Sequence, residues 1–140
     1  MQKNFQLKPS ILIVDDDPDI GIALGDWLRQ EGYSVHIVEY GKAGIDAFKL
    51  QVFNLVILDL GLPDMDGLEV LKHMKASNPR IPIIILTAFS FFERTTTRHD
   101  FEGIFAYLKK PYDRQEIKTT IGRALQFSLD PSAPFLGVTK

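Results

Sequence analysis

The sequence predicts a single α/β domain in which helices cover both faces of a five-stranded parallel sheet. Five short segments rich in isoleucine, valine or leucine have the length of strands, and segments with helical periodicity alternate with them. Strands that are apolar on both faces and alternate with helices are typical of parallel sheets buried between two helical layers. The 140 residues suffice for one domain with a substantial core.

The first 50 residues contain two strand–helix units. A strand is expected at Ile11–Asp15 and a weaker one at Ser34–Val38. Gly32 is expected to end the first helix, and Gly41–Leu50 has the length of the second. Apolar residues at helical spacing mark the buried side of the first helix: Ile20, Leu24, Trp27 and Leu28.

The rest of the chain repeats this alternation three times. Strands are expected at Phe53–Asp59, Ile81–Thr87 and, more weakly, Ile104–Leu108. The segment Phe91–Phe101 has the length of a helix but a less regular pattern. Two further helices are predicted by apolar stripes: Leu68, Leu71 and Met74, then Ile117, Ile121, Ala124 and Leu125. Asp17 and Asp66 are expected to cap helices, and Asp64 to lie in the loop before the third or to cap it.

Composition excludes several classes of protein. A net charge of −2 and a pI near 5.9 do not fit a nucleic-acid binder. The absence of cysteine excludes disulfides, thiolate metal sites and a cysteine nucleophile. No apolar run approaches the ~20 residues of a membrane span, and Met1–Pro9 lacks the apolar core of a signal peptide. We therefore expect a soluble, cytoplasmic protein that has no membrane contact.

The chemistry is expected at one edge of the sheet, because ligands of open parallel sheets bind outside the carboxyl ends of the strands. The first strand ends in Asp15–Asp17 and the third in Asp59, while Thr87 and Lys110 follow later strands. Clustered carboxylates repel one another unless a cation intervenes. A hard divalent ion, Mg²⁺ above all, relieves this repulsion and typically uses one or two carboxylates, waters and a phosphate.

A lysine and a threonine beside such a metal would bind the remaining oxygens of a phosphoryl group. The residue left to receive that group is a carboxylate, and aspartyl phosphates are known covalent species. The metal and the lysine would neutralise the charge that develops during transfer. The pattern at the strand ends therefore points to phosphoryl transfer onto an aspartate.

Four segments, in order and at near-family spacing, resemble the receiver domain of two-component response regulators. They are Ile11–Asp19 (ILIVDDDPD), Leu58–Gly67 (LDLGLPDMDG), Ile85–Ala88 (ILTA) and Tyr107–Pro111 (YLKKP). The resemblance covers residues 8–127, which leaves residues 1–7 as an extension and 128–140 as a tail or the start of a linker. It implies a flavodoxin-like fold with five helices and a doubly wound sheet in the order 2-1-3-4-5, the order that the chemotaxis member of the family has.

The resemblance also implies roles for the acidic residues. Asp59 corresponds to the phosphoacceptor, and its carboxylate is also a metal ligand. Asp15 and Asp16 correspond to the acidic pair that holds Mg²⁺ or Mn²⁺, Asp16 directly and Asp15 mostly through water. Gly61, two residues after the acceptor, would offer its backbone carbonyl to the metal.

Four further positions carry over from the family. Thr87 would hydrogen-bond the phosphoryl group with help from the Ala88 amide, and Lys110, which precedes Pro111, would pair with its oxygens. Tyr107 corresponds to a switch aromatic that turns inward when Thr87 moves. The resemblance thus implies a non-enzymatic signalling protein that accepts a phosphoryl group from a histidine kinase or phosphotransfer protein and assists its own hydrolysis. The surface of the fourth helix, fifth strand and fifth helix would then control a partner, an attached output domain or a homodimer.

One region departs from the family pattern. Thr87 and Lys110 are 23 residues apart, one more than usual, and the extra residue lies between Ala88 and Glu102. Thr95–Thr97 is a poor helix former, so the fourth helix is expected to be short, shifted or partly unwound. The same stretch is rich in aromatic residues, which leaves open whether they pack in the core or form a partner surface: Phe89, Phe91, Phe92 and Phe101.

Two alternative functions stay open at this point. A small phosphatase of the haloacid-dehalogenase type also uses an aspartyl phosphate, and Asp15-x-Asp17 superficially fits its first motif. Against it, Asp19 replaces the expected threonine and the late acidic motif is missing. The other alternative is a binding module that dimerises constitutively and no longer uses phosphorylation, which the unusual segment after Ala88 motivates. A flavin-binding protein is excluded, because no hydroxyl-rich phosphate loop follows the first strand.

Overall fold

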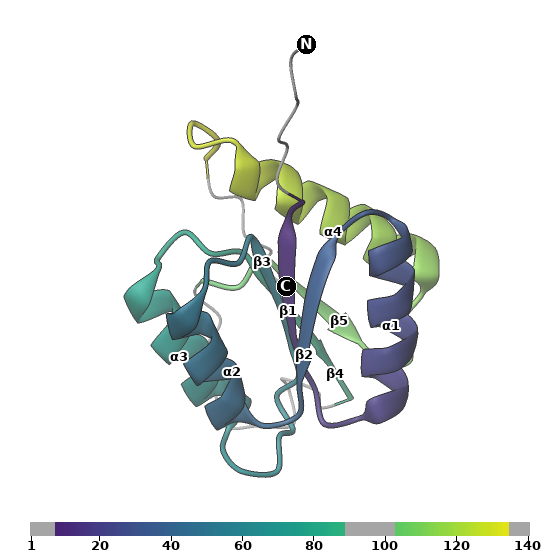
Figure 1. The fold of residues 1–140 in the computed structure, drawn as a ribbon, viewed down its shortest axis with the longest axis vertical. Helices are drawn as coiled ribbons and strands as arrows, with labels where there is room; N and C mark the ends of the chain where they lie inside the picture. The colour runs from purple at the N-terminus through teal and green to yellow at the C-terminus, as the bar shows by residue number, and fades with distance from the viewer. Residues whose placement is uncertain (1–7, 89–102, 135–140) are drawn as a thin grey trace.

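A computed structural model of the chain describes residues 8–88 and 103–134. Its five strands form one parallel sheet in the order β2-β1-β3-β4-β5, as the sequence predicted. Four helices lie in the described part of the chain, α1 and α4 on one face of the sheet and α2 and α3 on the other (Figure 1). The helix expected at Phe91–Phe101 and the extra residue after Ala88 fall outside the described residues.

The elements follow one another as the alternating pattern predicts. They are β1 (Ser10–Val14), α1 (Pro18–Gln30), β2 (Ser34–Val38), α2 (Gly41–Leu50), β3 (Leu55–Leu58), α3 (Gly67–Ser77), β4 (Ile83–Thr87), β5 (Ala106–Lys109) and α4 (Arg114–Leu129). Strand side chains alternate between two hydrophobic clusters. Ile11 and Ile13 of β1 pack toward α1 and α4, whereas Leu12 and Val14 pack toward α2 and α3. Burial of each such side chain contributes roughly 1.5–3 kcal/mol.

Four strands differ from the predicted bounds, and of these β1 is shifted by one residue, to Ser10–Val14. β3 begins at Leu55, and Asn54 just before it accepts a hydrogen bond from the Ser10 amide on its side-chain oxygen at 2.8 Å. β4 begins at Ile83, after Pro82, which has no N–H to donate. β5 is shifted to Ala106–Lys109. The apolar residues ahead of these strands are still buried, so burial extends further along the chain than strand geometry does.

The last helix continues two residues into the segment that the sequence leaves as a tail. α4 ends at Leu129, and the turn after it returns to the domain. Arg80 donates to the carbonyl oxygens of Ala133 at 3.1 Å and of Asp130 at 3.5 Å. Its guanidinium also lies 4.4 Å from the ring centroid of Phe127. This residue thus holds the chain where it leaves the last helix.

Helix ends follow the expected capping chemistry except at α2. Asp17 accepts from the Asp19 amide and Asp66 from the Leu68 amide, so both predicted caps are confirmed. Gly32, with a φ of +99°, lies just past the end of α1 in the left-handed region that favours glycine. Tyr40, at the N-cap of α2, makes no side-chain capping bond. The carboxylate that satisfies this helix comes instead from Asp64, far along the chain.

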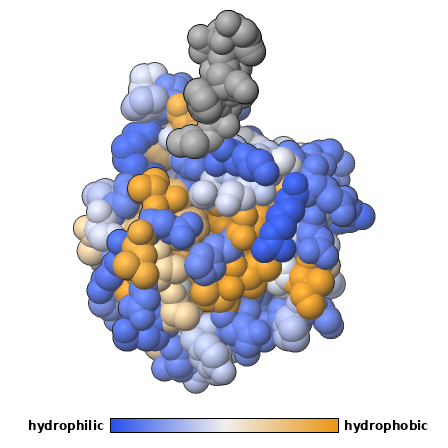
Figure 2. Space-filling view, viewed as in Figure 1, coloured by the Kyte–Doolittle hydropathy of each residue, from blue (hydrophilic) through white to orange (hydrophobic). Residues whose placement is uncertain are grey.

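β2 is an edge strand, and among the described helices α1 contacts it more extensively than α2 does. Ile37 packs on α1 where two glycines leave room; a Cβ at Gly25 would lie 2.7 Å from Ile37 Cδ1 and one at Gly21 3.0 Å from its Cγ2. Figure 2 shows apolar surface along the middle of this side of the molecule, with hydrophilic residues on both flanks. No helix in the described ranges combines the length and the apolar character needed to cross a membrane.

Candidate functional site

The sheet ladder holds the backbone of three charged residues just beyond the strand ends. The Asp15 amide donates to the Val38 carbonyl at 3.0 Å, and the Asp59 amide donates to Val14 at 2.9 Å. The Lys110 amide donates to the Thr87 carbonyl at 3.0 Å. These bonds continue the β1–β2, β1–β3 and β4–β5 pairings by one residue. The backbone of these three charged residues is therefore fixed by the sheet, and their side chains extend from its carboxyl edge.

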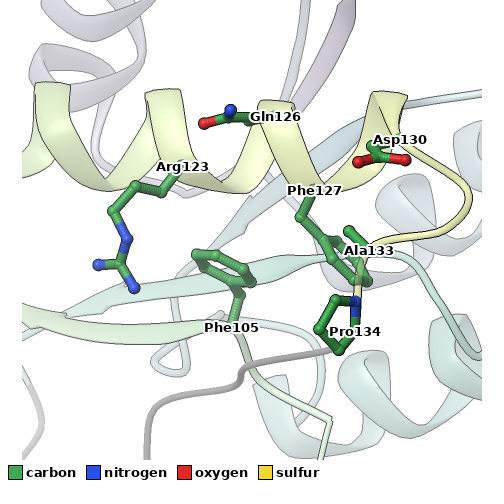
Figure 3. A pocket seen from close by; sticks show the side chains of 7 residues that line it. All are labelled: Phe105, Arg123, Gln126, Phe127, Asp130, Ala133 and Pro134. Carbon is green, nitrogen blue, oxygen red and sulfur yellow. The ribbon is translucent and has the colours of Figure 1, made fainter.

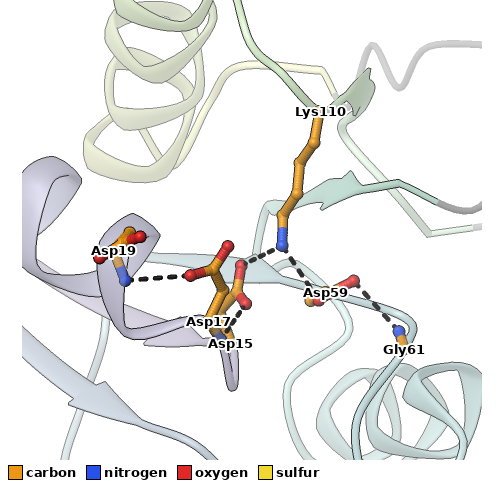
Figure 4. A network of polar contacts seen from close by, with 6 residues as sticks. All are labelled: Asp15, Asp17, Asp19, Asp59, Gly61 and Lys110. Atoms are coloured by element: carbon orange, nitrogen blue, oxygen red, sulfur yellow. Dashed lines mark hydrogen bonds and ion pairs between the residues drawn. The ribbon is translucent and has the colours of Figure 1, made fainter.

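Lys110 lies between two carboxylates. Its Nζ atom is 2.8 Å from Asp15 Oδ2 and 3.1 Å from Asp59 Oδ2 (Figure 4). Asp15 is 3% exposed, Asp59 is 6% exposed and the lysine side chain is 15% exposed. One nearly buried ammonium thus serves two nearly buried carboxylates, which leaves the cluster with net negative charge when all three are ionised.

This charge imbalance changes the pKa of Asp15. Burial raises the pKa of its carboxyl from 3.8 to about 6, even though Lys110 and the Asp17 amide favour the charged form, and the charge of Asp59 adds to the rise. Burial lowers the pKa of Lys110, but hydrogen bonds and attraction from both carboxylates outweigh it, so the pKa is raised. Lys110 therefore stays charged, but its single positive charge is fewer than the two negative charges of Asp15 and Asp59.

The acidic residues fit a hard divalent cation. Asp15, Asp16 and Asp59 each offer one carboxylate oxygen, and these three oxygens lie within 4.8 Å of one another. Asp16 is exposed, so the set opens toward solvent. Carboxylate oxygens with room for water are the ligands that Mg²⁺ uses. Burial raises the pKa of Asp15, and an additional positive charge beside it would favour the ionised carboxylate.

The remaining predicted site residues lie around this cluster. The Gly61 amide donates to Asp59 Oδ1 at 3.1 Å, which orients the carboxylate; the role of the Gly61 carbonyl stays a prediction. Thr87 ends β4 and is fully buried, and Ala88 follows it as an exposed residue. Tyr107 lies opposite Ile85 in the β4–β5 pairing and packs, half-buried, against the cluster of apolar residues on the α2–α3 side. The roles of Thr87, Ala88 and Tyr107 also stay predictions.

Gly67 supports the site, a role that the sequence reasoning missed. A Cβ at Gly67 would lie 2.5 Å from Leu60 Cα and 2.7 Å from the Asp59 carbonyl oxygen. The Gly67 amide also donates to the Leu60 carbonyl at 3.1 Å. The start of α3 therefore lies in close contact with the backbone of Asp59 and Leu60. The Asp-Gly dipeptide was the available signal, but it indicates a turn without showing which backbone approaches.

A hollow lies at the opposite edge of the sheet from the acidic cluster. It has a volume of about 250 Å³ between the C-terminal end of α4, the residue before β5 and the turn at 130–134 (Figure 3). Phe105 and Phe127 line it together with the charged Arg123 and Asp130. Phe105 precedes β5 whereas Lys110 follows it, so the hollow and the acidic cluster are at opposite ends of the strands. It contributes no residue to the cluster.

Comparison with known proteins agrees with this geometry. Residues 11–122 match the response regulator receiver domain family. The transcriptional regulatory protein ZraR of Escherichia coli K12 is 38% identical over 126 residues, which are 89% of this chain and 28% of ZraR. The chain therefore spans little more than a quarter of the length of that relative.

Two solved structures extend the likeness to the fold. The CheY-like receiver domain protein from Methanospirillum hungatei has a TM-score of 0.81 at 30% identity, over 87% of this chain and 97% of that one. TrrA from Thermotoga maritima, solved in complex with Mg(2+)-BeF, has a TM-score of 0.75 at 31% identity, over 84% and 99%. The chain belongs to the response regulator receiver domain family, whose members are signalling proteins of two-component systems.

Proposed function

We propose that Asp59 of this chain accepts a phosphoryl group from a phosphohistidine. The observation that carries the proposal is the position of its carboxylate, which Lys110 Nζ and the Gly61 amide hold at 3.1 Å each beside Asp15. An Asp59 oxygen attacks phosphorus as the P–N bond to the donor imidazole breaks, and the released imidazole nitrogen takes up a proton. The product is an acyl phosphate on Asp59.

Neighbouring side chains neutralise and orient the transferred group. Lys110, already between the two carboxylates, would pair with a phosphoryl oxygen. The Thr87 hydroxyl and the Ala88 amide, at the end of β4, would bind the other oxygens. Asp15, Asp16, Asp59 and the Gly61 carbonyl would hold Mg²⁺ or Mn²⁺, which supplies positive charge to phosphoryl oxygens when bound. With the same groups, the domain would assist hydrolysis of its own acyl phosphate.

Partners follow from this chemistry. A sensor histidine kinase or a phosphotransfer protein would supply the phosphoryl group to the open side of the cluster, next to Asp16. Tyr107 lies on β5 opposite Ile85, two residues before Thr87 on β4, and movement of Thr87 toward the phosphoryl group would open space into which Tyr107 turns. The altered surface around β5 and α4 would control an output domain, a separate partner or a homodimer. ZraR is named as a transcriptional regulator and is much longer than this chain, which favours an output domain in a longer protein.

Intact mass spectrometry tests the acceptor directly. The chain is incubated with acetyl phosphate and Mg²⁺, and we expect a gain of one phosphoryl group that chelation of the metal prevents. Asp59→Asn removes the nucleophilic oxygen and should abolish the gain. Asp113→Asn is the matched control, because Asp113 is an exposed cap of α4 outside the cluster. Full labelling of the Asp59→Asn protein, or none of the wild type with Mg²⁺ bound, would overturn the proposal.

A further inference from the structure

Asp64 joins two parts of the molecule that are distant in sequence. It lies exposed in the loop between β3 and α3, where its Oδ1 accepts from the Gly41 amide at 2.8 Å and its Oδ2 accepts from the Lys42 amide at 3.0 Å. These amides are the first two of α2, and they have no partner within their own helix. Tyr40, which occupies the N-cap position, makes no capping bond. The loop after the acceptor strand therefore caps a helix on the neighbouring strand unit.

The loop that carries Asp64 is the one that shapes the acidic cluster. It begins at Asp59, whose Oδ1 accepts from the Gly61 amide at 3.1 Å. Gly61 pairs with Asp66 in an isolated antiparallel bridge, which closes the base of the loop. Beyond this bridge, the two hydrogen bonds of Asp64 to α2 and the apolar packing of Leu62 and Met65 hold the rest of the loop. Met65 packs there so closely that a Cβ on Gly41 would lie 2.5 Å from Met65 Cγ.

We propose that Asp64 is a positioning residue for the metal and acceptor site, because its bonds to the start of α2 hold the Asp59–Gly61 backbone in place. This inference rests on the proposed function, in which Gly61 and Asp59 both bind the cation. Without the bonds to α2, only apolar packing and the Gly61–Asp66 bridge hold this loop, and its greater motion is transmitted through the bridge to Gly61, whose amide orients Asp59. A site that is competent for only part of the time binds its metal correspondingly more weakly.

A local cap would stabilise α2 equally well, which makes the long-range contact informative. Helix N-caps are usually supplied by a serine, threonine, aspartate or asparagine at the N-cap position itself. Here Tyr40 occupies that position with extended backbone angles that a capping residue also adopts, and its side chain is 52% exposed. The two effects of Asp64, capping α2 and holding the loop, can therefore be separated by substitution.

The experiment compares Asp64→Ala with the double variant Asp64→Ala/Tyr40→Ser. The single variant loses both the cap on α2 and the attachment of the loop to that helix. In the double variant, a serine hydroxyl at position 40 can accept from the Lys42 or Ala43 amide, which restores the cap without the loop attachment. We measure the stability of each protein by urea unfolding, the Mg²⁺ dissociation constant by calorimetry, and hydrogen exchange of the Gly61 amide in metal-free buffer.

We expect Mg²⁺ to bind about fivefold more weakly to Asp64→Ala, since an N-cap contact of ordinary strength is lost from the loop. The Gly61 amide should exchange faster by a similar factor. In Asp64→Ala/Tyr40→Ser, stability should return while the weaker Mg²⁺ binding and the faster exchange persist. If the serine restores all three, Asp64 only caps the helix and the inference is wrong.

Two further comparisons distinguish the loop attachment from an effect of charge and from failure of the metal site itself. Asp64→Asn removes the charge but keeps one acceptor oxygen, so binding closer to wild type than that of Asp64→Ala supports the attachment. Equal weakening by Asp64→Asn and Asp64→Ala would assign the effect to charge and overturn the inference. A wild-type chain that binds no Mg²⁺ would overturn the proposed function with it. If the wild type binds Mg²⁺ and every Asp64 variant binds it equally tightly, this inference is wrong but the proposed function stands.

Discussion

The two ends of the sheet are each organised around one basic residue, with opposite energetic consequences. At the carboxyl edge, Lys110 is 15% exposed and serves two carboxylates that are almost buried. At the amino edge, Arg80 is exposed, lies on the Phe127 ring and donates to the carbonyl oxygens of two residues in the turn after α4. The first arrangement confines more negative than positive charge, whereas the second places one exposed cation on neutral carbonyl and aromatic groups with the exposed Asp130 carboxylate nearby.

The contrast distinguishes the Lys110 cluster, whose charges are unbalanced, from the Arg80 contact, which stabilises the fold. Burial raises the pKa of Asp15 at the carboxyl edge, which means that the ionised cluster destabilises the folded chain in the absence of a further cation. Arg80 requires no such compensation, because carbonyl oxygens and an aromatic face accept a cation without a second charge. Buried clusters with unbalanced charge, such as the one around Lys110, occur mainly where a protein binds a ligand or a metal.

Loss of the central lysine should give the largest effect. Lys110→Met removes the only cation shown in contact with Asp15 and Asp59 within the described residues. Breaking a buried ion pair typically costs about 3–5 kcal/mol, and the partial exposure of this lysine places the expected loss near the lower end. Urea unfolding at pH 7 without metal measures it. A loss below about 1 kcal/mol would show that the carboxylates do not depend on Lys110.

Acid should stabilise the metal-free protein through Asp15. Its folded-state pKa of about 6 exceeds the unfolded value of 3.8, so the folded state holds more protons between these values. The contribution of this group is therefore fully present below about pH 4 and lost as the pH rises through about 6, by at most about 3 kcal/mol. The measurement is the difference in unfolding free energy between wild type and Asp15→Asn from pH 4 to 7. A flat difference would contradict the raised pKa.

Distortion of the backbone beneath the site should have an intermediate effect without changing any charge. In Gly67→Ala, the new Cβ would meet backbone atoms of Leu60 and Asp59 that cannot move as a side chain does. We expect a loss of about 2 kcal/mol, as for other overpacked positions, together with weaker Mg²⁺ binding. Gly122→Ala is the control, since nothing lies within 4 Å of a Cβ there. Equal stability of the two variants would mean that α3 does not press on the site.

The smallest effect is expected at the amino edge. Arg80→Ala removes an exposed cation–π contact and hydrogen bonds to two carbonyls, which together contribute about 1 kcal/mol. Hydrogen exchange of the Ala133 amide, which donates to Asp130, should become faster. Mg²⁺ affinity should not change, because this contact lies at the opposite end of the strands. A clear change in Mg²⁺ affinity would show that the two ends of the sheet are coupled.

Much of the fold and of the site composition could be predicted from sequence because both depend on local patterns. Apolar runs and helical stripes identified the elements, and two helix caps at Asp17 and Asp66 followed from residue type alone. Strand ends were less predictable, since Phe53 is buried although it precedes β3. Burial depends on what packs over a residue, whereas strand bounds depend on the partner for each backbone bond.

The amino-acid sequence alone was enough to establish the order of the elements, the residue types at the strand ends and the family to which they belong. How these groups meet became visible only in the folded chain: Lys110 contacts both Asp15 and Asp59, Asp64 caps α2, and Gly67 lies against the acceptor backbone. The physical reason is range. Periodicity, capping and turn preferences act over a few neighbouring residues, whereas electrostatic pairing and close backbone approach depend on distances that exist only once the sheet has formed.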